Sequence, residues 1–222
     1  MSNFGFLHLR VVNPYEAGFR EARSAVGAAP LLANAEEFKS VEEAVADCSL
    51  VVGTTAAQNR ELQQPLKLLQ SASPLIRKQL RCGRVALLFG SEKRGLSNAD
   101  FSHCHWLLRI PTREKHLSMN LGQAVAVCLY ELARSMAPER KPKAAQQDPK
   151  SDKPATAGEL ERITSLLVES LGASGYLKQH STIQEEKIRR MVRRLDLSAT
   201  DAELWLGMLR QILWKLTRDG SQ

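Results

Sequence analysis

The 222-residue sequence lacks several features that would assign it to common protein classes. It has no apolar run long enough to cross a bilayer, and its first residues lack the basic segment and apolar core of a secretory signal, so we expect neither. Its four cysteines lie far apart and form no CxxC pair, which argues against a disulfide framework. We interpret them as reduced core thiols of a cytoplasmic protein.

Motifs of several enzyme classes are also missing. The sequence contains no GxGxxG turn for dinucleotides, no P-loop for triphosphates and no GxSxG elbow of a hydrolase. His103 and His105 flank Cys104, but adjacent residues of a strand point to opposite faces, and no further ligands cluster with them in the sequence. We therefore expect no metal site.

Positive charge is what the sequence has in excess. Lys and Arg number 31 against 24 Asp and Glu, which gives a formal net charge of +7 and a pI near 9.4. This balance favours a polyanionic partner, with RNA ahead of an anionic membrane.

The pattern of apolar residues divides the chain into three parts. Residues 1–136 alternate continuous apolar strands with amphipathic helices, which is typical of an α/β domain with a mostly parallel sheet covered on both faces. Residues 137–156 are rich in Pro, Lys, Ala and Gln and predict a flexible linker. Residues 157–222 predict a small all-helical domain. The strands expected are 7–12, 30–32, 49–53, 84–89 and 106–110, and the helices of the first part are 41–47, 61–80 and 120–135.

The densest basic segment lies in the second helix of the C-terminal part. Four apolar residues recur at helical spacing and predict its inner face: Ile188, Met191, Val192 and Leu195. The basic residues would then lie on the opposite surface, either as a solvated face or as contacts to RNA phosphates. We predict phosphate contacts for Lys187, Arg189, Arg190, Arg193 and Arg194.

Two strand ends carry the most informative motifs of the chain. The apolar run at 85–89 breaks into Gly-Ser-Glu-Lys-Arg-Gly at 90–95, and the run at 106–110 ends at Pro111. Ser118-Met119-Asn120 then opens a strongly apolar helix. Glycines allow the backbone to pass close to a ligand, so these loops predict a site built mainly from backbone atoms.

These loops resemble motifs two and three of the SpoU (TrmH) branch of the SPOUT RNA 2′-O-methyltransferases, and the resemblance extends over most of residues 1–135. It implies a mostly parallel sheet with a deep trefoil knot, in which three strand-end loops enclose S-adenosyl-L-methionine. It also implies a homodimer with the active site near the interface. The last helix and the tail resemble the C-terminal extension of the TrmJ-type subgroup.

The resemblance assigns roles to residues of this sequence that match the family motifs. Ser118, Asn120 and Glu92 match its catalytic polar positions, although Ser118 also fits a helix N-cap. From its place in the 90–95 loop, Arg94 would contact RNA phosphate or a carboxylate on the cofactor side, or alternatively face solvent. The cofactor contacts implied are Gly53, Thr54, Gly90, Glu92, Ile110, Ser118, Met119 and Leu121.

The sequence departs from the family at its beginning. The family's first strand and its motif-one asparagine and arginine have no counterpart here, because residues 1–14 resemble the family's second strand and the helix end before it. None of Arg10, Arg20, Arg23 or Arg94 lies in the motif-one context. We expect that the chain begins at an internal methionine of a longer protein; the alternative is a natural form without the catalytic arginine.

The expected function is therefore S-adenosylmethionine-dependent methylation of an RNA ribose 2′-hydroxyl. The subgroup implies tRNA as the substrate, at the first nucleotide of the anticodon loop (position thirty-two). Three alternatives remain open: methylation of rRNA or of another tRNA position, a non-catalytic RNA-binding homologue, and a nucleotide-sensing regulator.

Overall fold

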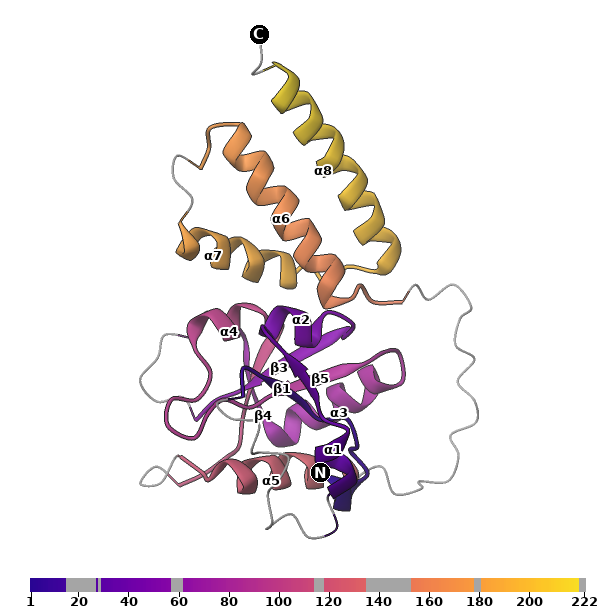
Figure 1. Cartoon of the computed structure of the whole chain (residues 1–222), viewed down its shortest axis with the longest axis vertical. Helices are drawn as coiled ribbons and strands as arrows, with labels where there is room; N and C mark the ends of the chain where they lie inside the picture. Colours follow the sequence, from indigo (N-terminus) through magenta and orange to yellow (C-terminus); the bar gives the residue numbers. More distant parts are fainter. Residues whose placement is uncertain are drawn as a thin grey trace.

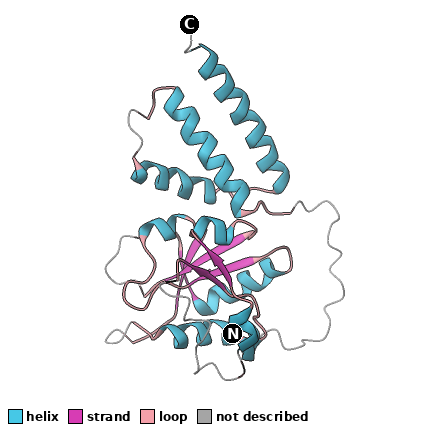
Figure 2. Ribbon diagram, in the orientation of Figure 1, coloured by secondary structure: helices cyan, strands magenta, loops and turns pink. Residues whose placement is uncertain are grey.

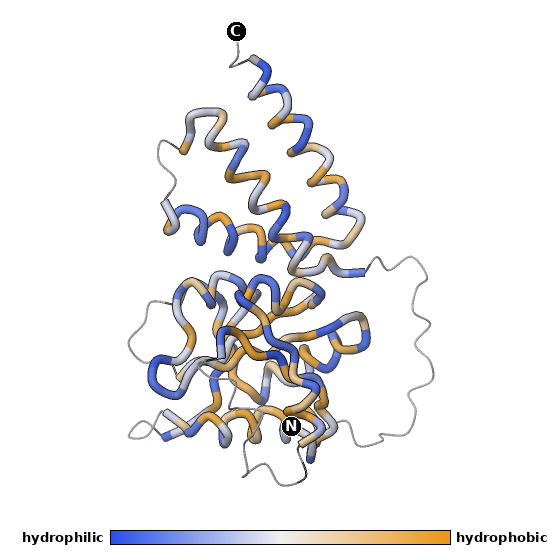
Figure 3. The backbone as a smooth tube through the Cα atoms, in the orientation of Figure 1, coloured by the Kyte–Doolittle hydropathy of each residue, from blue (hydrophilic) through white to orange (hydrophobic). Residues whose placement is uncertain are grey.

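The computed structural model describes residues 1–14, 27, 29–56, 62–113, 118–134, 153–177 and 181–219. An α/β part is followed by three helices that stand against one side of it (Figures 1 and 2). Apolar residues are frequent within the α/β part and alternate with hydrophilic residues along the three helices (Figure 3). None of the helices that the structure describes combines the length and the apolar character that a membrane crossing requires.

All of the described strands run parallel to their neighbours, in two separate sheets. The larger sheet has the order β4-β6-β3-β5, and the smaller one pairs β1 with β2. The strand bounds are β1 Arg10–Val12, β2 Glu36–Phe38, β3 Leu50–Thr54, β4 Leu66–Leu68, β5 Val85–Leu88 and β6 Trp106–Arg109. The parallel α/β architecture expected from the sequence is confirmed, but as two sheets rather than one.

Helices cover both faces of the larger sheet because the side chains of its central strand, β3, alternate between two cores. Val52 packs with the residues of α3 and α5, and Val51 packs with those of α2 and α4. Both valines are fully buried. The helices of this part are η1 Ser2–Phe4, α1 Ala29–Ala33, α2 Val41–Val45, α3 Leu69–Leu80, α4 Asn98–Ser102 and α5 Leu121–Arg134.

Two predicted elements of this part were wrong. Residues 30–32 were expected as a strand but lie in α1, where Pro30 occupies the first turn and its missing N–H removes no helical hydrogen bond. Residues 61–80 were expected as one interrupted helix, yet β4 occupies 66–68 and only 69–80 are helical. Leu66 to Leu68 pair with β6, so tertiary pairing overrides the local helical pattern.

The amino ends of the two sheets are joined through one carboxylate. Arg10 at the start of β1 donates from Nη2 to Asp47 Oδ2 at 2.8 Å, and Arg84, just before β5, also bonds Asp47. The hydrogen bond from Arg10 holds the pKa of Asp47 well below its usual range. Asp47 therefore bridges β1 and β5, which do not pair with each other among the described strands.

The C-terminal part, here called the helical unit, consists of α6 Ala157–Ala173, α7 Thr182–Arg193 and α8 Ala199–Asp219. Its own core contains Leu160, Ile163, Val192 and Leu206. Residues 153–156 were expected in the linker, but they belong to this unit: Ala155 is buried and its N–H donates to Leu197 O at 2.9 Å. The rest of the predicted linker, 137–152, lies outside the described residues.

The helical unit is docked on the α/β part. The first turn of α6 donates two backbone hydrogen bonds to the end of α2, from Ala157 N to Cys48 O at 2.8 Å and from Gly158 N to Ala46 O at 2.9 Å. Ala157 also belongs to the apolar core on the α2 and α4 side of the sheet. The start of α6 thus continues the helical layer on that face (Figure 1).

Candidate functional site

Three strand-end loops meet at the carboxyl edge of the larger sheet. Thr54 at the end of β3 donates from Oγ1 to Leu88 O at the end of β5, at 2.8 Å. The next residue, Thr55, donates its N–H to Leu108 O in β6 at 3.0 Å. The β3 loop is therefore held between the other two strand ends, at the edge where open parallel sheets bind their ligands.

The 90–95 loop after β5 is a small closed turn. Gly95 donates its N–H to Ser91 O at 2.8 Å and has a positive φ of 66°, a conformation that favours glycine. A Cβ added to Gly90 would come within 2.0 Å of the Gly95 carbonyl carbon. Both glycines are thus required by the backbone geometry, while residues 91–94 are exposed.

Glu92 and Asn120 come together across two of these loops. Asn120 Nδ2 donates to Glu92 Oε1 at 3.1 Å, while its Oδ1 accepts from Gly122 N at 2.9 Å and Gln123 N at 3.3 Å. Asn120 is therefore the residue that caps α5, and the cap suggested for Ser118 is wrong. An Asn immediately before an apolar helix was the sequence signal for this cap. The same side chain orients the carboxylate of the 90–95 loop.

The remaining predicted cofactor positions lie around this edge with differing exposure. Gly53 is buried between strands, and a Cβ there would meet Cys104 Sγ at 2.8 Å and Leu107 Cδ2 at 2.9 Å. Ile110, Met119 and Leu121 are half-buried, and Ser118 is exposed. The structure thus places all of the predicted positions on the three strand ends or at the start of α5.

The basic helix α7 agrees with the prediction only in part: Val192 is buried and Ile188 packs against the same core, as expected, but the rest of the predicted pattern is wrong. Met191 and Leu195, expected inside, are 43% and 42% exposed, whereas three of the arginines expected outside are buried. The buried ones are Arg189, Arg190 and Arg193, and the exposed ones of the predicted set are Lys187 and Arg194. Because buried guanidinium groups do not reach RNA, the first three lose the predicted phosphate contacts in this arrangement.

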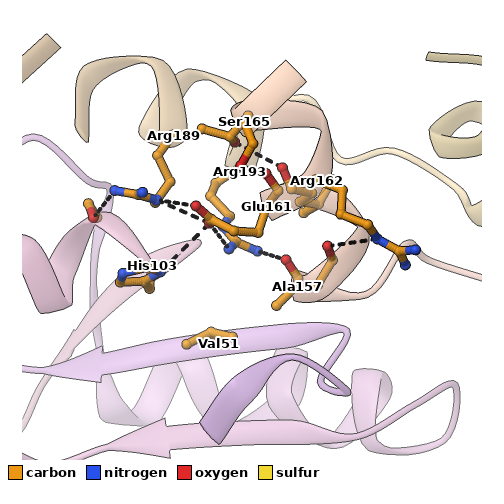
Figure 4. A network of polar contacts seen from close by, with 12 residues as sticks. Val51, His103, Ala157, Glu161, Arg162, Ser165, Arg189 and Arg193 are labelled. Atoms are coloured by element: carbon orange, nitrogen blue, oxygen red, sulfur yellow. Dashed lines mark hydrogen bonds and ion pairs between the residues drawn. The ribbon is translucent and has the colours of Figure 1, made fainter. Parts of the chain in front are cut away.

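The physical reason is a buried carboxylate on α6. Glu161 is 6% exposed and accepts from Arg189 Nε at 2.8 and 3.0 Å and from Arg193 Nη2 at 3.1 Å (Figure 4). Arg193 Nη1 also donates to Ala157 O at 3.1 Å. Buried charges persist when they are paired and hydrogen-bonded, so Glu161 turns this basic face inward. Burial lowers the pKa of Arg193, although Glu161 opposes this.

Two largely buried histidines near this interface have pKa values below the ordinary one. His105 Nδ1 accepts the Val51 N–H at 3.1 Å, and burial lowers the pKa of His105 to about 3. His103 Nδ1 lies 3.8 Å from Glu161 Oε2 and has no hydrogen-bond partner among the described residues. Burial, with the neighbouring Arg189, lowers the pKa of His103 to about 4. In the part of the chain that the structure describes, no group of three His, Cys, Asp or Glu residues is arranged to hold a metal ion.

The four arginines weighed as counterparts of motif one lie in different parts of the chain. Arg10 lies at the amino end of β1, where Asp47 and Glu36 hold it, on the opposite edge from the loops. Arg20 and Arg23 lie outside the described residues. Arg94 is exposed in the 90–95 loop, where its backbone N–H donates to Ser91 Oγ at 3.3 Å.

Comparison with known proteins assigns the family. Residues 1–130 match the SpoU rRNA Methylase family. The chain is 29% identical over 214 residues to a tRNA (cytidine/uridine-2'-O-)-methyltransferase TrmJ of Sodalis glossinidius, covering 96% of this chain and 83% of that protein. It is 30% identical to the Klebsiella pneumoniae protein of the same name, covering 96% and 87%.

Solved structures agree with this match. The crystal structure of TrmJ from Z. mobilis ZM4 superposes with a TM-score of 0.79 at 27% identity, covering 96% of this chain and 89% of that one. A probable methylase family protein from Haemophilus influenzae gives 0.56 at 26% identity, covering 98% and 89%. The parallel strands, the strand-end loops and these similarities agree, and the chain belongs to the SpoU methylase family, with its SPOUT-type α/β fold.

Proposed function

We propose S-adenosyl-L-methionine as the methyl donor, and a tRNA ribose 2′-oxygen as the acceptor, of this methyltransferase. The observation that carries the proposal is the meeting of three strand-end loops at one sheet edge, with the Glu92–Asn120 hydrogen bond joining two elements of that edge. The tRNA acceptor is supported by the names of relatives that match 96% of the chain. Position thirty-two follows from the resemblance to the same subgroup.

The donor fits the chemistry of the loops. S-adenosylmethionine supplies an electrophilic methyl group on a sulfonium. Its adenosine and methionine parts require backbone donors and acceptors with little side-chain bulk, which the 90–95 loop and the buried Gly53 provide. We assign the backbone of Ile110, Met119 and Leu121 to the same pocket, and Thr54 to the loop beside the adenine.

The polar residues at this edge would place the acceptor. A ribose hydroxyl must lose its proton as it is methylated, so groups around it have to orient it and stabilise the developing negative charge. We assign Ser118 and the Asn120 amide to the ribose side of the site. Glu92 fixes that amide through a 3.1 Å hydrogen bond, so it orients Asn120 rather than acting alone.

Partners and location complete the proposal. Arg94, Lys187 and Arg194 are exposed, and we assign them to RNA phosphates. We also propose a homodimer, which is supported by the exposed Val127 and Tyr130 on the outer face of α5. We further propose the knotted strand-end arrangement of the family and a cytoplasmic location.

The test is transfer of labelled methyl from S-adenosylmethionine to unmodified tRNA and, in parallel, to rRNA. This chain would be assayed beside a version extended upstream of Met1. Label on a tRNA 2′-oxygen with either protein supports the proposal, and label on rRNA alone would replace tRNA by rRNA. If neither protein transfers methyl but both bind tRNA, the chain is a non-catalytic RNA-binding member of the family.

A further inference from the structure

Arg189 joins three helices from two parts of the chain. Its Nε donates to Glu161 on α6 at 2.8 and 3.0 Å, and its Nη1 donates to Ser102 Oγ on α4 at 3.2 Å. Its Nη2 donates to Glu185 on its own helix at 2.8 Å. The side chain is 10% exposed. Figure 4 shows it between Glu161 and the α/β part. A single buried guanidinium therefore ties the helical unit to α4 of the α/β part.

The short helix α4 depends on tertiary contacts for its position. It has only five residues, and a helix of that length is unstable without tertiary contacts. A capping box between Ser97 and Asp100 closes its first turn, while Phe101 and Ser102 bury its last turn. The contact with α7 through Ser102 fixes α4 from outside the α/β part.

The 90–95 loop leads directly into α4. Leu96, the first residue after the loop, is 7% exposed and packs in the same core cluster as Phe101. The other end of the loop, Gly90, lies against the backbone of Gly95 without room for a Cβ. Because the loop is closed on itself and anchored at Leu96, a displacement of α4 displaces the loop together with Glu92.

We propose that Arg189 is a positioning residue, which clamps α4 to the helical unit and thereby holds the 90–95 loop in its donor-binding position. The helical unit then contributes to binding of the methyl donor without touching it. This role requires that Arg189 of α7 is buried rather than exposed to solvent. The proposal rests on the proposed function, since the loop's ligand is taken to be S-adenosylmethionine.

The experiment is calorimetric titration of the full chain with S-adenosylmethionine. Ser102→Ala removes the acceptor on α4 and leaves the Arg189–Glu161 pair in place, while Arg189→Met removes all three contacts. We expect the Kd to rise about threefold and about tenfold respectively. Ser102→Ala also removes the hydrogen bond that Ser102 Oγ donates to Ala99 O within α4, at 2.6 Å. The matched control is Ser170→Ala, a buried serine on α6 whose hydroxyl likewise donates to a backbone carbonyl, Leu166 O at 2.8 Å. Its Kd should not change.

Hydrogen exchange separates positioning from general destabilisation. In Ser102→Ala, faster exchange should be confined to residues 91–102, and the amides of α5 should keep their rates. An unchanged Kd in both variants would overturn the proposal, and so would equal losses in the Ser170→Ala control or faster exchange throughout the chain. Failure of the unaltered chain to bind S-adenosylmethionine would instead remove the proposed function.

Discussion

The 90–95 loop and helix α7 both carry dense positive charge, yet the structure treats the two segments in opposite ways. Lys93 and Arg94 in the loop are exposed, whereas Arg189 and Arg193 in α7 are buried against Glu161. The loop is supported by its glycines and by the backbone hydrogen bond that closes it, so its charged side chains are free to face solvent. The helix is held by these buried ion pairs together with Val192, which packs in the core of the helical unit.

The difference shows that basic density does not by itself identify a nucleic-acid surface. What decides is whether the fold brings a carboxylate to the basic face. Glu161 lies 28 residues before Arg189 and 32 before Arg193, so no local pattern in α7 reveals it. Basic residues with a buried carboxylate partner are held in the interior, and those without one remain available to a polyanion.

The largest expected effect comes from removing this carboxylate. Glu161→Leu leaves Arg189 and Arg193 buried without their main counter-charge, and breaking such a buried pair costs about 3–5 kcal/mol. Urea unfolding at pH 7 should show the loss. Glu169→Leu on the same helix removes an exposed carboxylate and should change stability by less than about 0.5 kcal/mol.

A compensated variant tests the cause of that loss. Replacing Glu161, Arg189 and Arg193 together by Leu, Met and Leu removes the charges along with their partners, so most of the stability should return. If Glu161→Leu alone were as stable as the unaltered chain, the buried network would not be what holds α7 in place.

The loop should instead be sensitive to its backbone. Gly90→Ala places a Cβ within 2.0 Å of the Gly95 backbone, so the turn must open and we expect the Kd for S-adenosylmethionine to rise at least about tenfold, or about 1.4 kcal/mol. Gly207→Ala in α8 faces open space and should stabilise the helix by up to about 1 kcal/mol without affecting binding. Equal affinity of the two variants would contradict the role assigned to the loop.

The parts of the fold that the sequence predicts well are those with strong local signals. The strands β3, β5 and β6 are largely continuous apolar runs, and the 90–95 loop is marked by its glycines, so the strands and the loop were found where expected. The capping role of Asn120 was accessible from its place before α5, but its hydrogen bond with Glu92 joins residues 28 positions apart.

The parts that were predicted wrongly depend on distant contacts. The strand β4 forms because it pairs with β6, about 40 residues later in the chain, although its own sequence fits a helix. The inward face of α7 depends on Glu161, and the docking of α6 depends on the carbonyl groups of Ala46 and Cys48. Burial of an arginine is decided by its partner, and the partner is not visible in a local pattern.

The next prediction concerns how the stability of the protein depends on pH, through the histidines where the helical unit meets the α/β part. Burial lowers the pKa of His103 to about 4 and of His105 to about 3, from an ordinary value of 6.5. The unfolded chain therefore binds more protons than the folded one below pH 6.5, so stability should fall as pH falls from 6.5 toward 4, by about 1–2 kcal/mol per histidine at pH 5. The pKa of Asp47 is depressed, so its contribution persists through this range and is lost only at lower pH.

Urea unfolding at pH 7.5 and at pH 5 measures this dependence. His103→Leu should reduce the difference between the two pH values by roughly half. His8→Leu, which replaces an exposed histidine, should leave the difference unchanged. The same pH dependence in all three proteins would show that the buried histidines are not its source.

The smallest effect per residue is expected for the basic side chains that remain exposed. Arg94→Gln, and Lys187→Gln with Arg194→Gln, each remove positive charge without disturbing a buried pair, so the fold should persist while tRNA affinity falls severalfold. Each lost phosphate contact should also lower the slope of log Kd against log salt by about 0.9. Lys78→Gln removes an exposed charge from α3, which covers the face of the sheet opposite to the helical unit, and this variant should leave that slope unaltered. If Lys78→Gln weakened tRNA binding as much as the other variants, net charge rather than position would govern the association. The contrast between exposed and buried basic residues would then not identify the RNA surface.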